Sequence, residues 1–285
     1  NNLTLYASYV INKYQVTFDD HGIQTTAEVE YNGLITKPTT DPQAPIGYKF
    51  IGWQAQGSDQ LWDFANDKMP TNDIVLVAQF EALDQVITLD FDGGTSDGPN
   101  EITAPTDSRV DIDAVKTPQK PGYQFVGWFD GETQVSGTII MPAGGLTLKA
   151  KWEETDQVIR FDANGGTGVD SIVAKTNATI TMEEFTTTRD GYEFIGWFDT
   201  NDQQVTGEFI VPAGGATFIA KWQALDQTIT FDVNGGDSAT QPEAIVQPTD
   251  TKVKLDKVAK PKKSGYTFAG WADKTGKKYA GTITM

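Results

Sequence analysis

One seven-residue phrase, Gly-Tyr-x-Phe-x-Gly-Trp, constrains this chain more than any other feature, because the sequence contains it four times. The four copies occupy residues 47–53, 122–128, 191–197 and 265–271. Their first glycines are 75, 69 and 74 residues apart, so the repeating unit is about seventy residues long. Self-similarity at a nearly fixed period predicts a chain built from repeated small domains.

Within each phrase, large side chains alternate with other residues, which is typical of a β-strand. Strict alternation would place Tyr, Phe and the second Gly on one face, and the middle residue and Trp on the other. The second Gly has no side chain, so a neighbouring group can approach the strand there. We interpret the phrase as the core strand of a small domain; the alternative is an aromatic surface that binds a ligand.

The repeat divides the 285 residues into four modules and one leading segment. Residues 3–9, Leu-Thr-Leu-Tyr-Ala-Ser-Tyr, repeat the pattern of Leu146–Trp152 near the end of a repeat. We therefore interpret residues 1–9 as the closing strand of a preceding module. The last module ends at Met285, before the position of its own closing strand. The predicted modules are module 1 (residues 10–82), module 2 (83–154), module 3 (155–224) and module 4 (225–285).

Modules 2 to 4 begin with the same sequence of elements. An alternating strand is followed by Asp-Gly or Asn-Gly, which favours a tight hairpin because both turn positions need positive φ. A connector that starts with Thr106, Thr176 or Thr249 follows. In module 3, Thr181 and Glu184 have the spacing of a capping box, which predicts one or two helical turns. The fold class expected is mainly β with short helices (α+β), with each sheet covered on one face as in the β-grasp plan.

The segments that join the modules also repeat. Residues 80–85, 152–157 and 222–227 each place four residues between the last aromatic side chain and the next Gln. They contain no Gly, Ser or Pro, so they are unlike flexible linkers. We expect the last strand of one module to continue almost directly into the next, with Leu83 and Leu225 packed at the joint. This organisation predicts an elongated string of beads in which each module touches only its neighbours.

The residue types argue against catalysis. The chain has no cysteine and one histidine, His21, which lies in a predicted hairpin turn. Neither a Ser–His nor a Cys–His pair can therefore recur, and an imidazole zinc site cannot be built. Residues 90–97 bear a superficial likeness to a calcium loop, but the acids do not recur in register in modules 3 and 4. We predict no enzyme activity, no catalytic residues, no metal site and no cofactor.

The charge is strongly acidic but uneven. A formal net charge of −17 argues against nucleic acid or an anionic membrane as a general partner. From Ile229 onward, however, nine lysines face six acidic residues. Lys260, Lys262 and Lys263 form the candidate ligand-binding patch for an anionic polymer; the alternative is solvated surface charge. No apolar run approaches the ~20 residues that span a bilayer, and no signal peptide begins the chain.

A family resemblance rests on specific residues of module 1. Residues 16–18, 47–53, 62–64 and 69–70, followed by the closing strand, resemble the internalin B-repeat, also called the Listeria–Bacteroides repeat. Modules 2 to 4 lack the Trp62-Asp63-Phe64 pattern and are similar through the aromatic phrase, the hairpin and the closing strand. The resemblance implies β-grasp-like modules in a protein of the bacterial cell surface.

The resemblance leads to two functional hypotheses. The first is a non-catalytic, extracellular stalk or spacer of an adhesin- or internalin-like protein, anchored to the cell wall through other parts of the parent protein. The second is that the modules themselves bind host glycan, mucin or a receptor. A further hypothesis concerns copies of this chain: residues 1–9 of one molecule would complete module 4 of another by head-to-tail strand exchange. The alternative is that the sequence is an out-of-phase segment of a longer array of modules.

Overall fold

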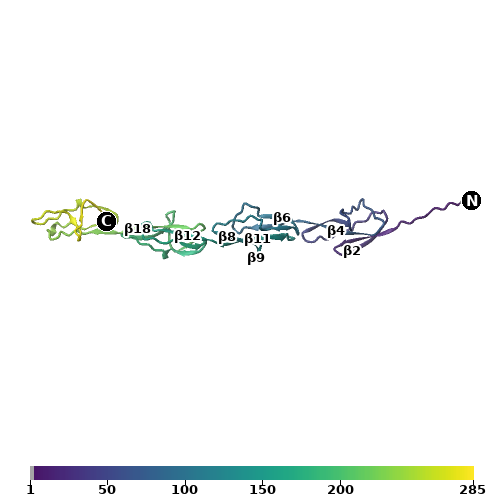
Figure 1. Cartoon of the computed structure of the whole chain (residues 1–285), viewed down its shortest axis with the longest axis horizontal. Helices are drawn as coiled ribbons and strands as arrows, with labels where there is room; N and C mark the ends of the chain where they lie inside the picture. The colour runs from purple at the N-terminus through teal and green to yellow at the C-terminus, as the bar shows by residue number, and fades with distance from the viewer. Residues whose placement is uncertain (1–2) are drawn as a thin grey trace. The chain divides into compact units, whose positions relative to one another are not determined.

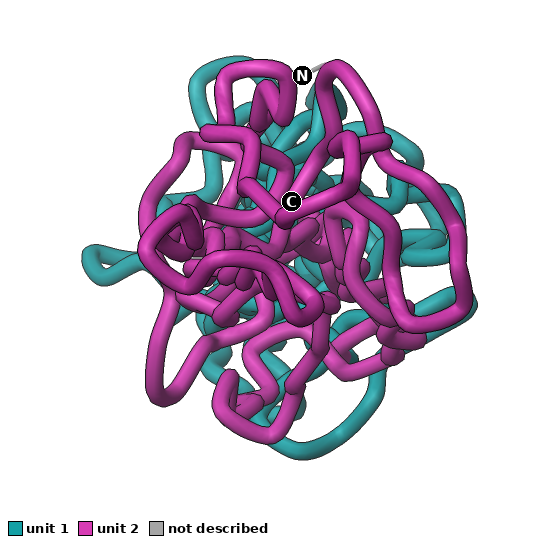
Figure 2. The backbone as a smooth tube through the Cα atoms, turned by 90° about the vertical axis from the view of Figure 1, so that its left-hand side faces the viewer, with its two compact units in different colours: residues 1–120, 125–153 teal, residues 121–124, 154–285 magenta. Residues whose placement is uncertain are grey.

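The computed structural model describes residues 3–285, which fold mainly into β-strands (Figure 1). The mainly-β expectation is therefore confirmed. The chain divides into two compact units, residues 1–120 with 125–153 and residues 121–124 with 154–285 (Figure 2). Each unit contains two hydrophobic cores. Within residues 3–285, no helix combines the length and the apolar character that crossing a membrane requires.

In module 1, four strands form one sheet with the closing strand in its interior. The order is β2-β1-β4-β3, and β4 runs parallel to β1 and antiparallel to β3. Leu76 and Ala78 of β4 are buried together with Val16 and Trp53. The closing strand thus joins the β1–β2 hairpin to the strand of the aromatic phrase. The bounds are β1 (Lys13–Asp20), β2 (Ile23–Glu30), β3 (Tyr48–Ala55) and β4 (Ile74–Ala82).

Modules 2 and 3 share a larger version of this sheet. Module 2 has the order β6-β5-β11-β8-β9 with a separate β10-β7 pair, and module 3 has β13-β12-β18-β15-β16 with a β14-β17 pair. The closing strands β11 and β18 again lie in the middle. The bounds in module 2 are β5 (Asp84–Asp90), β6 (Glu101–Pro105), β7 (Arg109–Asp111), β8 (Tyr123–Asp130), β9 (Thr133–Val135), β10 (Thr138–Ile140) and β11 (Leu146–Glu154). Those in module 3 are β12 (Asp156–Asp162), β13 (Ile172–Lys175), β14 (Thr179–Thr181), η1 (Met182–Glu184), β15 (Tyr192–Phe198), β16 (Gln204–Val205), β17 (Glu208–Ile210) and β18 (Ala216–Ala224).

Module 4 has the same outer elements but no strand between them. Its strands form three separate pairs, β19-β20, β21-β24 and β22-β23. Across residues 3–285, no strand occupies the place that β11 and β18 fill between the corresponding hairpins of modules 2 and 3. The bounds are β19 (Asp226–Ile229), η2 (Ser238–Thr240), β20 (Ile245–Pro248), β21 (Lys252–Lys254), η3 (Leu255–Lys257), β22 (Trp271–Ala272), β23 (Lys278–Tyr279) and β24 (Thr282–Thr284).

The aromatic phrase contains a β-bulge, which corrects the expected division of its side chains between two faces. The register of β3 against β4 shifts between Phe50 and Gly52, and β15 shifts likewise between Phe194 and Gly196. A bulge adds one residue to one strand and so reverses the alternation beyond it. Trp53 therefore lies in the same core as Phe50, with ring centroids 5.8 Å apart, and not on the opposite face.

The predicted helical turn of module 3 is present, but the predicted capping box does not form. η1 is a single 3-10 turn, and Thr181 makes no side-chain cap hydrogen bond. A 3-10 turn of three residues is tighter than the α-helical first turn that a capping box requires. Glu183 instead accepts a hydrogen bond from the backbone N–H of Gly207 at 2.7 Å. The turn is thereby tied to the β14–β17 pair.

The joints are short, as expected, and their leucines are largely accessible. One residue separates each closing strand from the next opening strand: Leu83, Thr155 or Leu225. Leu83 is 40% exposed and Leu225 is 43% exposed, so neither side chain is part of a buried core. Their backbone groups hold the joint instead, as described below.

The described part of the leading segment, residues 3–9, is not part of a sheet. The predicted closing strand of residues 1–9 begins with Asn1 and Asn2, which lie outside the described residues. Residues 3–12 have no strand assignment. Leu3 and Leu5 are 81% and 83% exposed.

The closing strand should decide how much a phrase tryptophan stabilises its module. Trp128 is 4% exposed and its ring centroid lies 5.4 Å from that of Phe125, whereas Trp271 of module 4 is only half-buried. Trp128→Ala should destabilise module 2 by about 3–5 kcal/mol. Trp271→Ala should cost clearly less in module 4. Module-resolved hydrogen exchange measures both, and equal losses would show that the closing strand does not govern the burial of this ring.

Candidate functional site

The joint between successive modules repeats one set of backbone hydrogen bonds. In module 1, the first glycine of the phrase, Gly47, accepts a hydrogen bond from the N–H of Leu83 at 2.8 Å. The carbonyl of Leu83 in turn accepts from the N–H of Thr106 in module 2 at 2.9 Å. The same two bonds recur within the second unit with distances of 2.9–3.0 Å. The residues there are Gly122, Thr155 and Thr176 at one joint, and Gly191, Leu225 and Thr249 at the other.

A threonine hydroxyl lies at the centre of each joint. The Oγ1 of Thr106 is within donating distance of two carbonyl oxygens, that of Gly47 at 2.9 Å and that of Leu83 at 3.0 Å. Thr176 and Thr249 have the same pair of acceptors at 2.8–3.3 Å. Thr106 and Thr176 are buried, so their hydroxyls need these partners. The connector threonines noted in the sequence are therefore joint residues.

A tyrosine from the phrase adds a side-chain contact across each joint. The hydroxyl of Tyr48 donates to a carboxylate oxygen of Asp107, and that of Tyr192 donates to Asp250. At the third joint, the amide of Asn177 donates to the hydroxyl of Tyr123. The acceptor or amide residue has a left-handed backbone in every case, with φ of 62–66°. The phrase and the connector are both evident in the sequence, whereas the contact between them is not.

The first glycine of the phrase is required by both conformation and space. Gly191 has φ of 76°, and a Cβ there would lie 2.6 Å from Oγ1 of Thr249. Gly265 of module 4 has φ of 77°, and a Cβ there would meet no atom within 4 Å. The two glycines thus have the same backbone conformation, and they differ only in that a joint threonine lies close to Gly191 and no atom lies close to Gly265.

This pair of glycines separates strain from joint packing. Gly265→Ala should cost only the penalty of a left-handed alanine, about 1–2 kcal/mol. Gly191→Ala should cost about 1–3 kcal/mol more, because the added methyl group displaces Thr249. Hydrogen exchange of the Leu225 and Thr249 amides reports the opening of this joint. If the two variants lose the same stability, the glycine acts through conformation alone.

The Tyr–Asp contacts raise the pKa values of the joint tyrosines Tyr48 and Tyr192. The hydrogen bond to Asp107 raises the pKa of Tyr48, and desolvation and the negative charge of Asp107 act in the same direction. The pKa of Tyr192 is raised in the same way by Asp250. A raised folded-state pKa means that the neutral phenol stabilises the joint at pH below its ordinary pKa of 10.0.

The contribution of Tyr48 should therefore be lost only as the pH rises through its raised pKa. Asp107→Ala should return the pKa of Tyr48 toward its ordinary value, because the acceptor and its negative charge are removed. The pH dependence of the Tyr48 ring-carbon chemical shift in NMR measures this change. An unchanged midpoint in the variant would contradict a role for Asp107.

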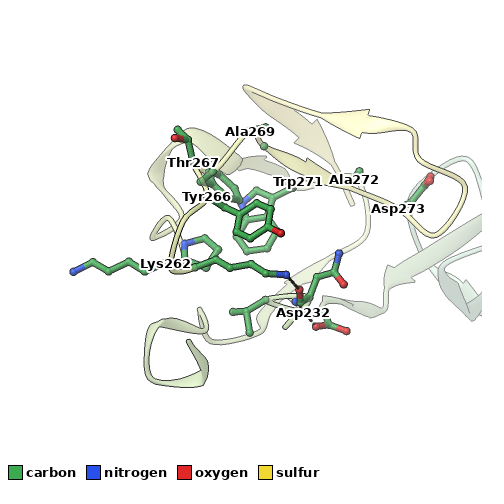
Figure 3. A pocket seen from close by; sticks show the side chains of 14 residues that line it. Asp232, Lys262, Tyr266, Thr267, Ala269, Trp271, Ala272 and Asp273 are labelled. Atoms are coloured by element: carbon green, nitrogen blue, oxygen red, sulfur yellow. Dashed lines mark hydrogen bonds between the residues drawn. The ribbon is translucent and has the colours of Figure 1, made fainter. Parts of the chain in front are cut away.

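A cavity of about 360 Å³ opens in module 4, against the aromatic phrase (Figure 3). Tyr266, Thr267, Ala269 and Trp271 line it from one side, and Asp232 and Lys262 lie on it from other segments. In modules 2 and 3 a closing-strand tryptophan lies beside the corresponding hairpin. Trp152 Nε1 donates to the carbonyl of Phe91 and Trp222 Nε1 to that of Ala163, both at 3.0 Å. The cavity thus marks the place of the closing strand.

The three candidate lysines line two cavities of module 4. Lys262 and Lys263 line the cavity of about 360 Å³, whereas Lys260 lines a second one of about 140 Å³. Lys263 Nζ donates to the carbonyl of Asn234 at 2.9 Å and lies 5.1 Å from the Tyr266 ring centroid. Lys120 and Arg189 make the same hairpin contact in modules 2 and 3, at 2.8 and 3.4 Å. Lys263 therefore has a structural role in its hairpin.

Aspartate side chains near the hairpins accept hydrogen bonds from backbone N–H groups of the turns. Asp90, Asp162 and Asp232 each accept the N–H of the residue two positions on, at 2.8–2.9 Å. Asp90 therefore recurs in register, so the expectation that it changes in modules 3 and 4 is wrong, whereas Asp92 does change, to Asn164 and Asn234. In the part of the chain that the structure describes, no three acidic or His side chains are arranged to hold a metal ion. His21 occupies the turn of its hairpin, with φ of 52° and Nδ1 2.7 Å from Asp20.

Comparison with protein families identifies the repeat in all four modules. A family model described as the Listeria–Bacteroides repeat domain matches residues 14–79, 86–151, 158–221 and 228–285. Each match contains one copy of the aromatic phrase. Modules 2 to 4 therefore match the family model although they lack the Trp62-Asp63-Phe64 pattern.

Three curated proteins are similar to the chain. Two are from Evansella cellulosilytica: a "Putative Gly-rich membrane protein", 29% identical over 94% of the chain, and a "Putative membrane protein", 30% identical over 94%. The third is Internalin H of Listeria monocytogenes, 37% identical over 50% of the chain. The matches cover 31%, 40% and 26% of these relatives, so the chain spans less than half of each.

Proposed function

Because the chain belongs to the Listeria–Bacteroides repeat family, we propose that it is a non-catalytic stalk or spacer within a bacterial surface protein. The names of its relatives, an internalin and two membrane proteins, support the surface location. On this proposal the chain lies outside the cell and is anchored to the cell wall through other parts of its parent protein.

The repeated joint is the observation that carries the spacer function. A spacer must resist folding back on itself, so neighbouring modules need a fixed connection and not a flexible linker. One residue between strands, a bridging threonine hydroxyl and a tyrosine contact provide such a connection, and they recur with matching distances. A string of beads is the arrangement that these joints favour.

The module architecture fits the β-grasp plan that the family resemblance implies. In modules 1 to 3 the first and last strands are parallel neighbours in the middle of a mixed sheet. In module 3 a short 3-10 turn packs through Met182 against the buried face. This arrangement supports a β-grasp-like interpretation of the modules.

Direct adhesion is the second candidate function. Lys260 and Lys262 support it, because nine lysines face six acidic residues from Ile229 onward and an anionic host glycan would be attracted to this basic module. On this alternative the modules themselves bind glycan, mucin or a host receptor.

Binding to mucin, a heparin-like polysaccharide and host-cell surfaces at physiological salt distinguishes the two functions. A spacer should show no saturable binding to any of them. The matched variants are Lys260→Ser with Lys262→Ser, and Lys274→Ser with Lys278→Ser as the control of equal charge change. Saturable binding that the first pair abolishes and the control pair retains would replace the spacer by an adhesive function.

A further inference from the structure

In modules 2 and 3 the chain enters and leaves through two strands that are parallel neighbours. Module 2 begins with β5, directly after the joint residue Leu83, and ends with β11, directly before the joint residue Thr155. The two strands pair in parallel over four successive positions: Ile87–Leu146, Thr88–Thr147, Leu89–Leu148 and Asp90–Lys149. In module 3, β12 and β18 lie between the joint residues Thr155 and Leu225 and pair in the same register.

This connectivity decides how a pull along the chain acts on module 2. A pull through Leu83 acts on the beginning of β5, and a pull through Thr155 acts on the end of β11. Because the strands are parallel, these two points lie at opposite ends of the pair, and the pull drives the strands past each other. The ladder hydrogen bonds join the strands side by side, so they are loaded together. Residues 91–145 lie outside this path.

The side chains of the two strands oppose sliding. Ile87 and Leu89 of β5, and Leu148 and Ala150 of β11, are 0–3% exposed and belong to one core. Successive residues of a strand point to opposite faces, so a slip by one residue would turn this apolar set toward solvent. The strands therefore cannot slip by single residues, and the ladder and the core must yield together.

A glutamine side chain reinforces the parallel pair beyond its ladder. Gln157 is 9% exposed, and its Oε1 accepts a hydrogen bond from the N–H of Gly214, which precedes β18, at 2.9 Å. Its Nε2 donates to the hydroxyl of the joint residue Thr176 at 3.0 Å. Gln85 of module 2 accepts from the N–H of Gly144 in the same way, at 2.9 Å. The glutamine thus ties the start of the closing strand to the opening strand, at the point where a pull enters the module.

We propose that modules 2 and 3 are tension-bearing elements, in which the parallel pair of the opening and closing strands carries a pull along the chain. Each module then transmits force from one joint to the next while its hairpin, connector and aromatic phrase stay folded. Module 1 has the same parallel pair, β1 with β4, so the same role extends to it. This inference goes beyond the spacer function, because a spacer must keep a distance, whereas a tension-bearing element must withstand a pull.

Pulling single molecules of the full chain from different attachment points tests the proposal. The chain has no cysteine, so introduced cysteines give unique points for handles. Asp84→Cys with Glu153→Cys pulls β5 and β11 from opposite ends, whereas Asp84→Cys with Ala143→Cys pulls them from the same end. All three positions are exposed. Module 2 should unfold at a severalfold higher force through the first pair, because the second pair opens the ladder one bond at a time.

Two matched substitutions separate mechanical resistance from stability. Ile87 lies in the parallel pair and Ile112 outside it, and both are buried in the core of module 2, at 0% and 2% exposure. Ile87→Val and Ile112→Val each remove one methyl group from this core. When the full chain is pulled from its two ends, Ile87→Val should lower the force of one unfolding event, whereas Ile112→Val should leave all of the forces unchanged.

Equal unfolding forces through the two cysteine pairs, or forces that fall equally with the two valine substitutions, would overturn the proposal. Hydrogen exchange of module 2 without a pull is the control, and it should show a loss of stability in both valine variants. None of these outcomes depends on whether a module binds a glycan, so the measurement is separate from that of the spacer function.

Discussion

The closing strand is the element on which each module depends. In modules 1 to 3 it pairs with both the opening hairpin and the aromatic phrase, so its backbone hydrogen bonds unite two halves of a sheet. Its core-facing residues are small or aliphatic next to the phrase tryptophan, as Ala78 opposite Trp53 illustrates. Where this strand is absent from the described residues, in module 4, the sheet separates into pairs and the tryptophan is only half-buried.

The same strand also connects modules. One residue after β4 ends, β5 of the next module begins, so a single nearly continuous stretch contributes to two cores. The joint residue uses its N–H and carbonyl groups to bind the phrase glycine before it and the connector threonine after it. Because these hydrogen bonds use only backbone groups, they do not depend on which side chain the joint residue has. The joint residue can therefore be Leu83, Thr155 or Leu225 without a change of geometry.

Much of this organisation could be predicted from the sequence, because repetition reveals which residues play equal roles. The four-fold phrase, the hairpins and the short joints all follow from it. The bulge at Gly52 could not be predicted, since a glycine in a strand indicates close approach and a bulge equally well. Nor could the contact of Tyr48 with Asp107: the two residues are far apart in sequence, and only the fold of two adjacent modules brings them together. The exposure of Leu83 shows the same limit, because an apolar side chain at a joint does not reveal that its backbone makes the contact.

The repeated joints predict a fixed connection between neighbouring modules. Residual dipolar couplings of backbone amides in modules 1 and 2, measured in the weakly aligned full chain, test this prediction. A fixed joint predicts that one alignment tensor fits the couplings of both modules, and that Thr106→Val separates them into two tensors. Two different tensors in the unmodified chain would contradict a fixed joint, whatever hydrogen bonds its residues can form.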